Sequence, residues 1–379
     1  MKKIIVIGNS IAGVKALETI RGFDAESDLT IFALDGFYPY NRELFVDYFL
    51  KKIKESKLSY KPKEFYEQNR INVILQRQIS RINFKNKRIF TPEKDQIDFD
   101  ILIIADTHQV KFPDIKGTSK TGVFALRKLS DLKKIIAALP FVETIVIETN
   151  SPQGFRMADA FKKAGKEVIV VLPSPIINFR HSEEHSDEES HPKEILRFAQ
   201  NDEKALFPNT LVITQKLEQT GIQVILDSSI AEILGEAEVK AIRLKSGKVL
   251  AAEMLVFTDT PPDLRLFNDT GLEMGEKIWV DSSFKTNLEG VFALDHAAQL
   301  KEESLNQFDP TAMSYLEEAG KTAASNIAGL NKMNVLTILS KDDANWADKA
   351  LKAEKAGYVG RKESSNFLSK FPVENRKYM

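Results

Sequence analysis

The chain contains no cysteine, and this absence restricts the chemistry that it can perform. Without cysteine there can be no structural disulfide, no thiolate zinc site, no redox dithiol and no thiol nucleophile. A protein of this composition that transfers electrons must therefore carry them on an organic cofactor.

Long apolar runs and an excess of charge of one sign are also missing. No stretch approaches the roughly 20 apolar residues that cross a bilayer, and the N-terminal apolar run over residues 2–7 is too short for a signal peptide. With a net charge of −1, the chain has no long-range attraction to nucleic acid or to an anionic membrane. We therefore expect no nucleic acid and no membrane as partners, and a cytoplasmic location.

The segments that are present predict an α/β protein. At 379 residues, with 43% hydrophobic and 28% charged residues, the chain exceeds one ordinary core, so we expect more than one domain. Strand-like and helix-like patterns alternate, which favours parallel sheets. Two strand–helix–strand units are expected, over residues 2–34 and 144–172. Residues 221–257 predict a meander over the segments QVILDS, SIAEILG, VKAIRLKSGKV and MLVFTD, with a hairpin at LKSGKV.

The sharpest motif is Gly8-Asn9-Ser10-Ile11-Ala12-Gly13, between the first strand and the first helix. Dinucleotide-binding turns place glycines at the first, third and sixth positions, so that a pyrophosphate can approach the backbone amides at the helix N-terminus. Ser10 replaces the third-position glycine and adds a hydroxyl donor, and Asp35 at the end of the second strand is placed to bind a ribose. The alternative is a doubly wound domain that keeps this turn for packing alone.

Further motifs follow in a fixed order along the chain. They are GNSIAGVKALETIR, IFALDGFYPYNREL, ILIIADTHQVKFPDIKG, VFALRKLSDLKKI, LVFTDTPPDLRLFNDTGLEM, IWVDSSFKTNLEGVFALDHAA and YLEEAGKTAASNIAG. In order and spacing, this series resembles the pyridine nucleotide–disulfide oxidoreductase superfamily, and within it NADH:rubredoxin reductase and the large subunit of nitrite reductase. The resemblance covers residues 1 to about 335, apart from an acidic stretch.

The resemblance implies two Rossmann-like dinucleotide-binding domains. A discontinuous FAD domain would comprise residues 1–115 and 252–330, an NAD(P)-binding-like domain would be inserted at 116–251, and a short C-terminal extension would follow at 331–379. The implied function is an FAD-dependent oxidoreductase that passes electrons from NAD(P)H through flavin to a small redox protein or another acceptor.

The resemblance also implies cofactor contacts, although it assigns no catalytic residue. Gly8, Ser10 and Gly13 would face the FAD pyrophosphate, and Asp35 would bind the adenosine ribose. Arg42 would lie near the flavin phosphates, and Asp295 would bind the ribityl chain. The expected binding set also includes Ile11, Ala12 and Ala105. A surface ion pair is the alternative for Arg42, and a helix N-cap is the alternative for Asp295.

Several glycines of the family pattern are replaced. Thr107, Asp259 and Leu294 each add a side chain where a backbone approach is usual. In the second unit, Thr149 and Ser151 stand at two of the three glycine positions, and the site for NAD(P)H is therefore expected to be eroded. These changes motivate the alternative function, a degenerate, non-catalytic relative that keeps the fold, and possibly FAD, as a binding or partner module.

Residues 180–204 do not fit the α/β pattern. They are polar and acidic, a composition typical of disorder, and the segment resembles a translated interspersed DNA repeat. His181 and His185 have a spacing that could chelate a metal on a helix, but the surrounding solvated residues predict an insert without a metal site.

Overall fold

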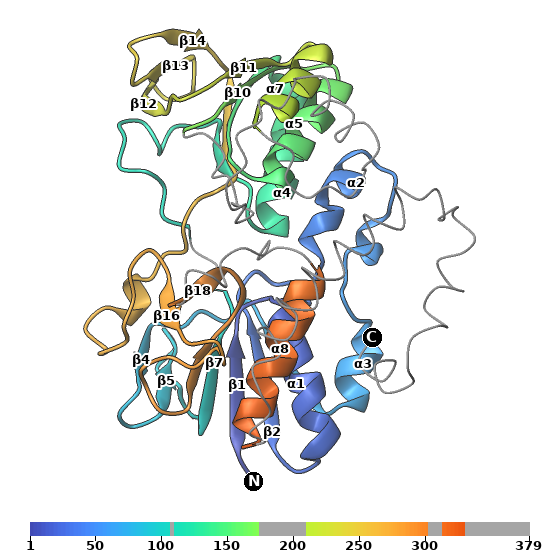
Figure 1. Cartoon of the computed structure of the whole chain (residues 1–379), viewed down its shortest axis with the longest axis vertical. Coiled ribbons are helices and arrows are strands. Elements are labelled where there is room, and N and C mark those ends of the chain that lie inside the picture. Colours follow the sequence, from blue (N-terminus) through green and yellow to red (C-terminus); the bar gives the residue numbers. More distant parts are fainter. Residues whose placement is uncertain (107–109, 174–209, 302–312, 330–379) are drawn as a thin grey trace, which may run out of the picture. The chain divides into compact units, whose positions relative to one another are not determined.

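The computed structural model describes residues 1–106, 110–173, 210–301 and 313–329 (Figure 1). The predicted insert at 180–204, the C-terminal extension at 331–379 and Thr107 lie outside these ranges. The described residues form an α/β fold with two five-stranded parallel sheets, as predicted. None of the described helices combines the length and the apolar character needed to cross a membrane.

The first sheet has the strand order β17-β7-β1-β2-β3. Its strands are β1 (Lys3–Ile7), β2 (Asp28–Ala33), β3 (Ile71–Leu75), β7 (Ile101–Ile104) and β17 (Val291–Ala293). The strands β1 and β7 are almost uniformly apolar and buried, which is typical of parallel strands covered on both faces. Because β17 pairs with β7, a segment late in the sequence completes the sheet that begins at the N-terminus.

Two helices pack closely on one another beside this sheet (Figure 1). They are α1 (Ile11–Phe23) and α8 (Met313–Ile327). A Cβ atom on Gly320 of α8 would overlap the carbonyl oxygen of Ala12 and lie 2.9 Å from the backbone nitrogen of Ala16. Small residues on both helices therefore hold α8 against the first turns of α1.

The second sheet has the order β11-β10-β9-β15-β8. Its strands are β8 (Val123–Ala125), β9 (Thr144–Glu148), β10 (Glu167–Val171), β11 (Gln223–Ile225) and β15 (Met254–Phe257). The associated helices are α4 (Leu129–Ala138), α5 (Pro152–Lys163) and α7 (Thr210–Gln219). The strand β15 falls within the 252–330 range predicted for the first domain, but it pairs with β9 and β8 of the second sheet.

The predicted meander over residues 221–257 is wrong for its first and last strands. Only β12 (Ile230–Leu234), β13 (Ala241–Leu244) and β14 (Val249–Ala251) form an antiparallel sheet, with the predicted hairpin between β13 and β14. The strands β11 and β15 instead join the parallel sheet. Short apolar runs carry no periodicity that distinguishes a parallel from an antiparallel neighbour, so the pattern alone could not place them.

The remaining strands are short. An antiparallel sheet contains β4 (Arg81–Asn83), β5 (Arg88–Phe90) and β6 (Gln96–Asp98), and β16 (Ile278–Val280) pairs in parallel with β18 (Ala298–Leu300).

Two short helices, α2 (Phe45–Phe49) and α3 (Lys63–Gln68), lie between β2 and β3. The Phe49 ring meets Phe161 of α5 edge to face, with ring centroids 5.3 Å apart, inside a shared hydrophobic core. This contact anchors the segment before α2, which carries Tyr40 and Arg42, to the helices of the second sheet.

We predict that Gly320→Ala lowers the free energy of unfolding by about 1 to 3 kcal/mol, because the added methyl group must displace backbone atoms of α1. Gly22→Ala is the matched control, since Gly22 is also helical and a Cβ atom there meets nothing within 4 Å. The control should be neutral or stabilising by up to about 1 kcal/mol. Urea unfolding followed by circular dichroism measures both, and equal stabilities of the two variants would contradict the close α1–α8 packing.

Candidate functional site

The turn after β1, residues 8–13, is built around a glycine that no other residue can replace without strain. Gly8 has a φ of +110°, and a Cβ atom there would lie 2.5 Å from the backbone nitrogen of Asp106. Ser10 is the N-cap of α1, and its Oγ accepts a hydrogen bond from the Gly13 amide at 3.4 Å. The first turn is thus closely packed against the end of β7.

Four backbone donors of the first turn have no acceptor within the described part of the chain. They are the N–H groups of Asn9, Ser10, Ile11 and Ala12, and all four residues are buried. They lie at the N-terminus of α1, where the helix dipole also favours negative charge. This combination of aligned donors and positive potential suits an anion.

Asp295 follows β17 and lies next to this turn. Its Oδ2 accepts a hydrogen bond from the Ser10 hydroxyl at 2.8 Å, and its Oδ1 accepts one from the His296 amide at 2.7 Å. Burial raises the pKa of Asp295, while the nearby Arg42 guanidinium opposes this effect. The N-cap of the short helical turn here is Leu294, so Asp295 is not the helix N-cap considered as its alternative.

Arg42 joins two buried carboxylates. Its Nη2 lies 3.5 Å from Asp106 and 3.5 Å from Asp295, and its side chain is 15% exposed. Burial alone would lower the pKa of this guanidinium, but the two carboxylates raise it. The alternative of a surface ion pair for Arg42 is therefore wrong.

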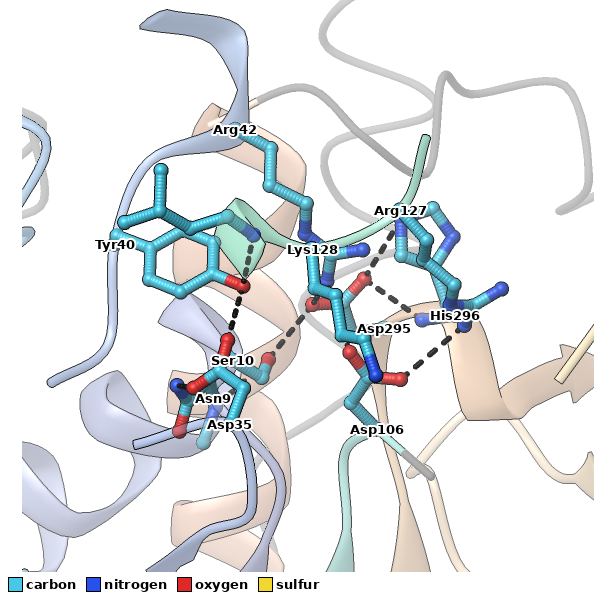
Figure 2. Close-up of polar contacts among 12 residues, drawn as sticks. Asn9, Ser10, Asp35, Tyr40, Arg42, Asp106, Arg127, Lys128, Asp295 and His296 are labelled. Atoms are coloured by element: carbon cyan, nitrogen blue, oxygen red, sulfur yellow. Dashed lines mark hydrogen bonds and ion pairs between the residues drawn. The ribbon is translucent and has the colours of Figure 1, made fainter. Parts of the chain in front are cut away.

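A second arginine completes the charge cluster. Arg127 lies 3.3 Å from Asp106 and donates a hydrogen bond to the carbonyl oxygen of Thr260 at 2.9 Å. Figure 2 shows Arg42 and Arg127 converging on Asp106 and Asp295, with His296 beside them. Two anionic and two cationic side chains thus stand at the end of the first sheet.

Asp35 lies beside the first turn, as its position after β2 predicts, but it contacts protein groups. Its carboxylate accepts hydrogen bonds from the Asn9 side-chain amide and, at 2.6 Å, from the Tyr40 hydroxyl. The Tyr40 oxygen in turn accepts one from the Leu129 amide at 3.0 Å. A ribose hydroxyl at Asp35 would compete with these partners, and the ribose contact stays a prediction.

The remaining predicted residues serve the packing of the turn. Ile11, Ala12 and Ala105 are buried, and the Ala105 amide donates to the carbonyl oxygen of Ile7 at 2.9 Å. A Cβ atom on Gly13 would lie 2.6 Å from the Cγ1 of Val6, so this glycine permits close contact between α1 and β1. That these four residues also contact a cofactor stays a prediction.

Sequence reasoning did not assign roles to five side chains of the site: Asn9, Tyr40, Asp106, Arg127 and His296. Each of them lies in a segment that carries the family resemblance, so a signal was present. The spacing of residues could not show which of these side chains point toward the first turn.

A second turn, residues 149–154, precedes α5 and has the same local geometry. Ser151 is the N-cap, and its Oγ accepts a hydrogen bond from the Gly154 amide at 3.3 Å. A Cβ atom on Gly154 would overlap the side chain of Thr149. The Asn150 amide, however, donates to Asp259 at 2.5 Å, so this turn already has an internal acceptor.

The two turns open onto spaces of different size. The cavity at the first turn is about 20 Å³, room for about one water molecule. The cleft at the second turn is about 1010 Å³ and is lined by Glu148, Asn150, Phe257, Asp259 and Thr260, among others. At the first turn the side chains of Arg42 and Asp295 line the narrow space.

Comparison with known proteins places the chain in one family. The family described as pyridine nucleotide-disulphide oxidoreductase matches residues 2–192 and 209–310. The chain is 24% identical to an NADH oxidase of Methanocaldococcus jannaschii, over 86% of this chain and 70% of that protein. It is 25% identical to a rubredoxin-NAD(+) reductase of Ectopseudomonas oleovorans, over 79% of this chain and 72% of that protein.

A solved structure shows the same fold. The ferredoxin reductase of Rhodopseudomonas palustris aligns with a TM-score of 0.72 at 16% identity, over 88% of this chain and 78% of that chain. The resemblance inferred from the motifs is thereby confirmed, and this chain belongs to the pyridine nucleotide-disulphide oxidoreductase family.

Proposed function

We propose that this protein is an FAD-dependent oxidoreductase that passes electrons from NAD(P)H through the flavin to a small redox protein. The observation that carries the proposal is the first turn, whose amides at Asn9, Ser10, Ile11 and Ala12 have no acceptor among the described residues. Family membership supports the oxidoreductase class. The names of the rubredoxin-NAD(+) reductase and the ferredoxin reductase support a small redox protein as the acceptor.

The residues at the first turn fit the diphosphate of FAD. The glycine at position 8 keeps the turn free of a side chain, and the helix N-terminus supplies donors and positive potential. Arg42 contacts Asp106 and Asp295 at 3.5 Å, so a phosphate that drew its guanidinium away would have to replace these two ion pairs. Because the cavity is only about 20 Å³, cofactor binding requires side chains that line it, Arg42 among them, to move.

Asp295 suits the hydroxyl groups of a ribityl chain. Its carboxylate is buried and already accepts a hydrogen bond from the Ser10 hydroxyl, so its orientation is fixed. A charged acceptor binds hydroxyl donors more strongly than a neutral one. Bound FAD would supply the redox chemistry that a chain without cysteine cannot supply from its own side chains.

His296 is held as a neutral imidazole beside the charge cluster. Burial lowers its pKa well below the usual value, and Arg42, Arg127 and Lys277 lower it further. The Asp295 carboxylate, 3.6 Å from the ring, does not outweigh these effects. At neutral pH the ring therefore adds no positive charge to the site.

The comparisons give no support to the alternative of a non-catalytic relative, since the matching proteins carry the names of oxidases and reductases. NAD(P)H as the electron donor is consistent with these names. The second turn is the position at which the fold would hold it.

We predict that Arg42→Gln lowers the affinity for FAD by about 10- to 100-fold, the loss expected when one charge-assisted hydrogen bond of about 1.5 to 3 kcal/mol is removed. Arg42→Lys, which keeps the charge, should retain most of the affinity. Flavin fluorescence quenching on titration of the apoprotein measures the dissociation constant. Arg88→Gln removes an exposed partner of Asp98 and is the matched control. Equal affinities of the Arg42→Gln and control proteins would exclude Arg42 from the cofactor site.

We also predict that the purified protein is yellow, that NADH or NADPH bleaches it in the absence of oxygen, and that an oxidised rubredoxin or ferredoxin restores the colour. Visible absorption spectra follow each step. A colourless protein that takes up no added FAD would refute the flavoprotein function. A yellow protein that neither nucleotide bleaches would refute NAD(P)H as the donor.

A third prediction concerns acid stability. The unfolded chain protonates His296 below its ordinary pKa of about 6.5, whereas the folded chain resists protonation, so this residue favours unfolding as the pH falls through that value. His296→Gln should therefore lose less stability than the parent between neutral and mildly acidic pH. Urea unfolding at several pH values gives the difference. The other four histidines lie outside the described residues and are the same in both proteins. Parallel pH profiles would refute the neutral state of His296.

A further inference from the structure

The two sheets place an aspartate at the same position beside each turn. In the first sheet Ile7 at the end of β1 is in register with Ile104 of β7, and Asp106 follows two residues later. In the second sheet Glu148 at the end of β9 is in register with Phe257 of β15, and Asp259 follows two residues later. Asp106 and Asp259 are therefore equivalent residues, each next to the turn of its own sheet.

The two aspartates have different partners. Asp106 forms ion pairs with Arg42 and Arg127, at 3.5 and 3.3 Å. Asp259 forms no ion pair with any residue of the described ranges. Its Oδ2 instead accepts hydrogen bonds from the Asn150 amide at 2.5 Å and from the Thr149 hydroxyl at 3.1 Å.

The donors of the second turn are therefore used within the chain. Besides the Asn150 amide, the Ser151 amide donates to the Thr149 hydroxyl at 3.1 Å, and Pro152 has no N–H group. At the first turn, the corresponding amides of Asn9, Ser10 and Ile11 have no acceptor among the described residues. At these equivalent positions the amides have no acceptor among the described residues in one sheet, whereas in the other sheet the Asn150 and Ser151 amides have acceptors within the chain.

Two carboxylates near the second turn also disfavour the binding of an anion there. Glu148 ends β9, and burial together with the nearby Asp259 carboxylate raises the pKa of its carboxyl. A diphosphate placed at the second turn would be repelled by these carboxylates. It would also have to displace a charge-assisted hydrogen bond from the Asn150 amide.

We propose that Asp259 closes the second dinucleotide site and sets a low affinity for nicotinamide nucleotides. Its carboxylate takes the amide that a diphosphate would otherwise use, so NAD(P)H binds only when this side chain turns away. The proposal rests on the proposed function in one respect: NAD(P)H is the electron donor, and its diphosphate binds at this turn. It makes Asp259 a specificity-determining residue of the second site.

Calorimetric titration of the full-length protein, as purified, with ADP-ribose tests this proposal. Asp259→Ala should bind ADP-ribose at least tenfold more tightly than the parent, because the competing acceptor and its charge are both removed. Asp259→Asn, which keeps a neutral acceptor, should show a smaller gain. Adenosine, which has no phosphate, should bind equally to all three proteins.

Asp227→Asn is the matched control. Asp227 follows β11 of the same sheet and is exposed, so its replacement changes the net charge equally without touching the turn. An unchanged affinity for ADP-ribose in Asp259→Ala would overturn the proposal. An equal gain in Asp227→Asn would also overturn it, because overall charge would then explain the effect. A gain for adenosine as large as that for ADP-ribose would likewise overturn it, since the site would have been reshaped generally.

This titration is independent of the redox test. It needs no electron transfer, so a protein that binds no FAD would refute the proposed function and leave the ADP-ribose comparison intact. Conversely, a yellow protein bleached by NADH whose Asp259→Ala variant gains no affinity would refute only the role of Asp259. Thermal melting of each variant verifies that the protein tested is folded.

Discussion

The site depends on which groups accept the hydrogen bonds of backbone amides at the start of α1. A buried N–H group without an acceptor costs about 1 to 3 kcal/mol, so a folded chain rarely leaves several together. Asn9, Ser10, Ile11 and Ala12 are all buried, and no described residue accepts from their amides. An acceptor from outside the described residues, such as water or a ligand, is therefore required, and the helix dipole favours an anionic one.

The charge cluster beside this turn is poorly explained by stability. Transferring charged groups from water into the protein costs several kcal/mol each, and their mutual attraction offsets this only with good geometry. The contacts of Arg42 with Asp106 and Asp295 are long, at 3.5 Å, so the pairing is loose. A loosely paired buried arginine is more useful as a group that can rearrange toward a phosphate than as a fixed structural tie. Arg127, which also binds the Thr260 carbonyl, is the more firmly held of the two.

Local patterns predicted the parts of the fold that depend on neighbours in sequence. The turn from Gly8 to Gly13, its flanking strand and its helix follow from spacing alone, and the structure places them as predicted. The short helix α2 and the pairing of β15 did not follow, because burial of Phe49 against Phe161 and the choice of a parallel neighbour are decided by distant parts of the chain. Likewise, the sequence showed that Asp259 replaces a glycine of the family pattern, but not that its carboxylate meets an amide 109 residues earlier.

The two turns show how little of the backbone needs to change for a site to close. Both have a serine N-cap that accepts a hydrogen bond from a glycine amide three residues later, at 3.4 and 3.3 Å. Both also have an aspartate two residues after the end of the neighbouring strand. The difference lies in the cations: Arg42 and Arg127 draw the Asp106 carboxylate into ion pairs, whereas Asp259 has no such partner among the described residues and bonds to the turn itself. Because a carboxylate forms its strongest hydrogen bonds with charged donors, the arginines beside the first strand end account for an aspartate that leaves the turn amides without an acceptor.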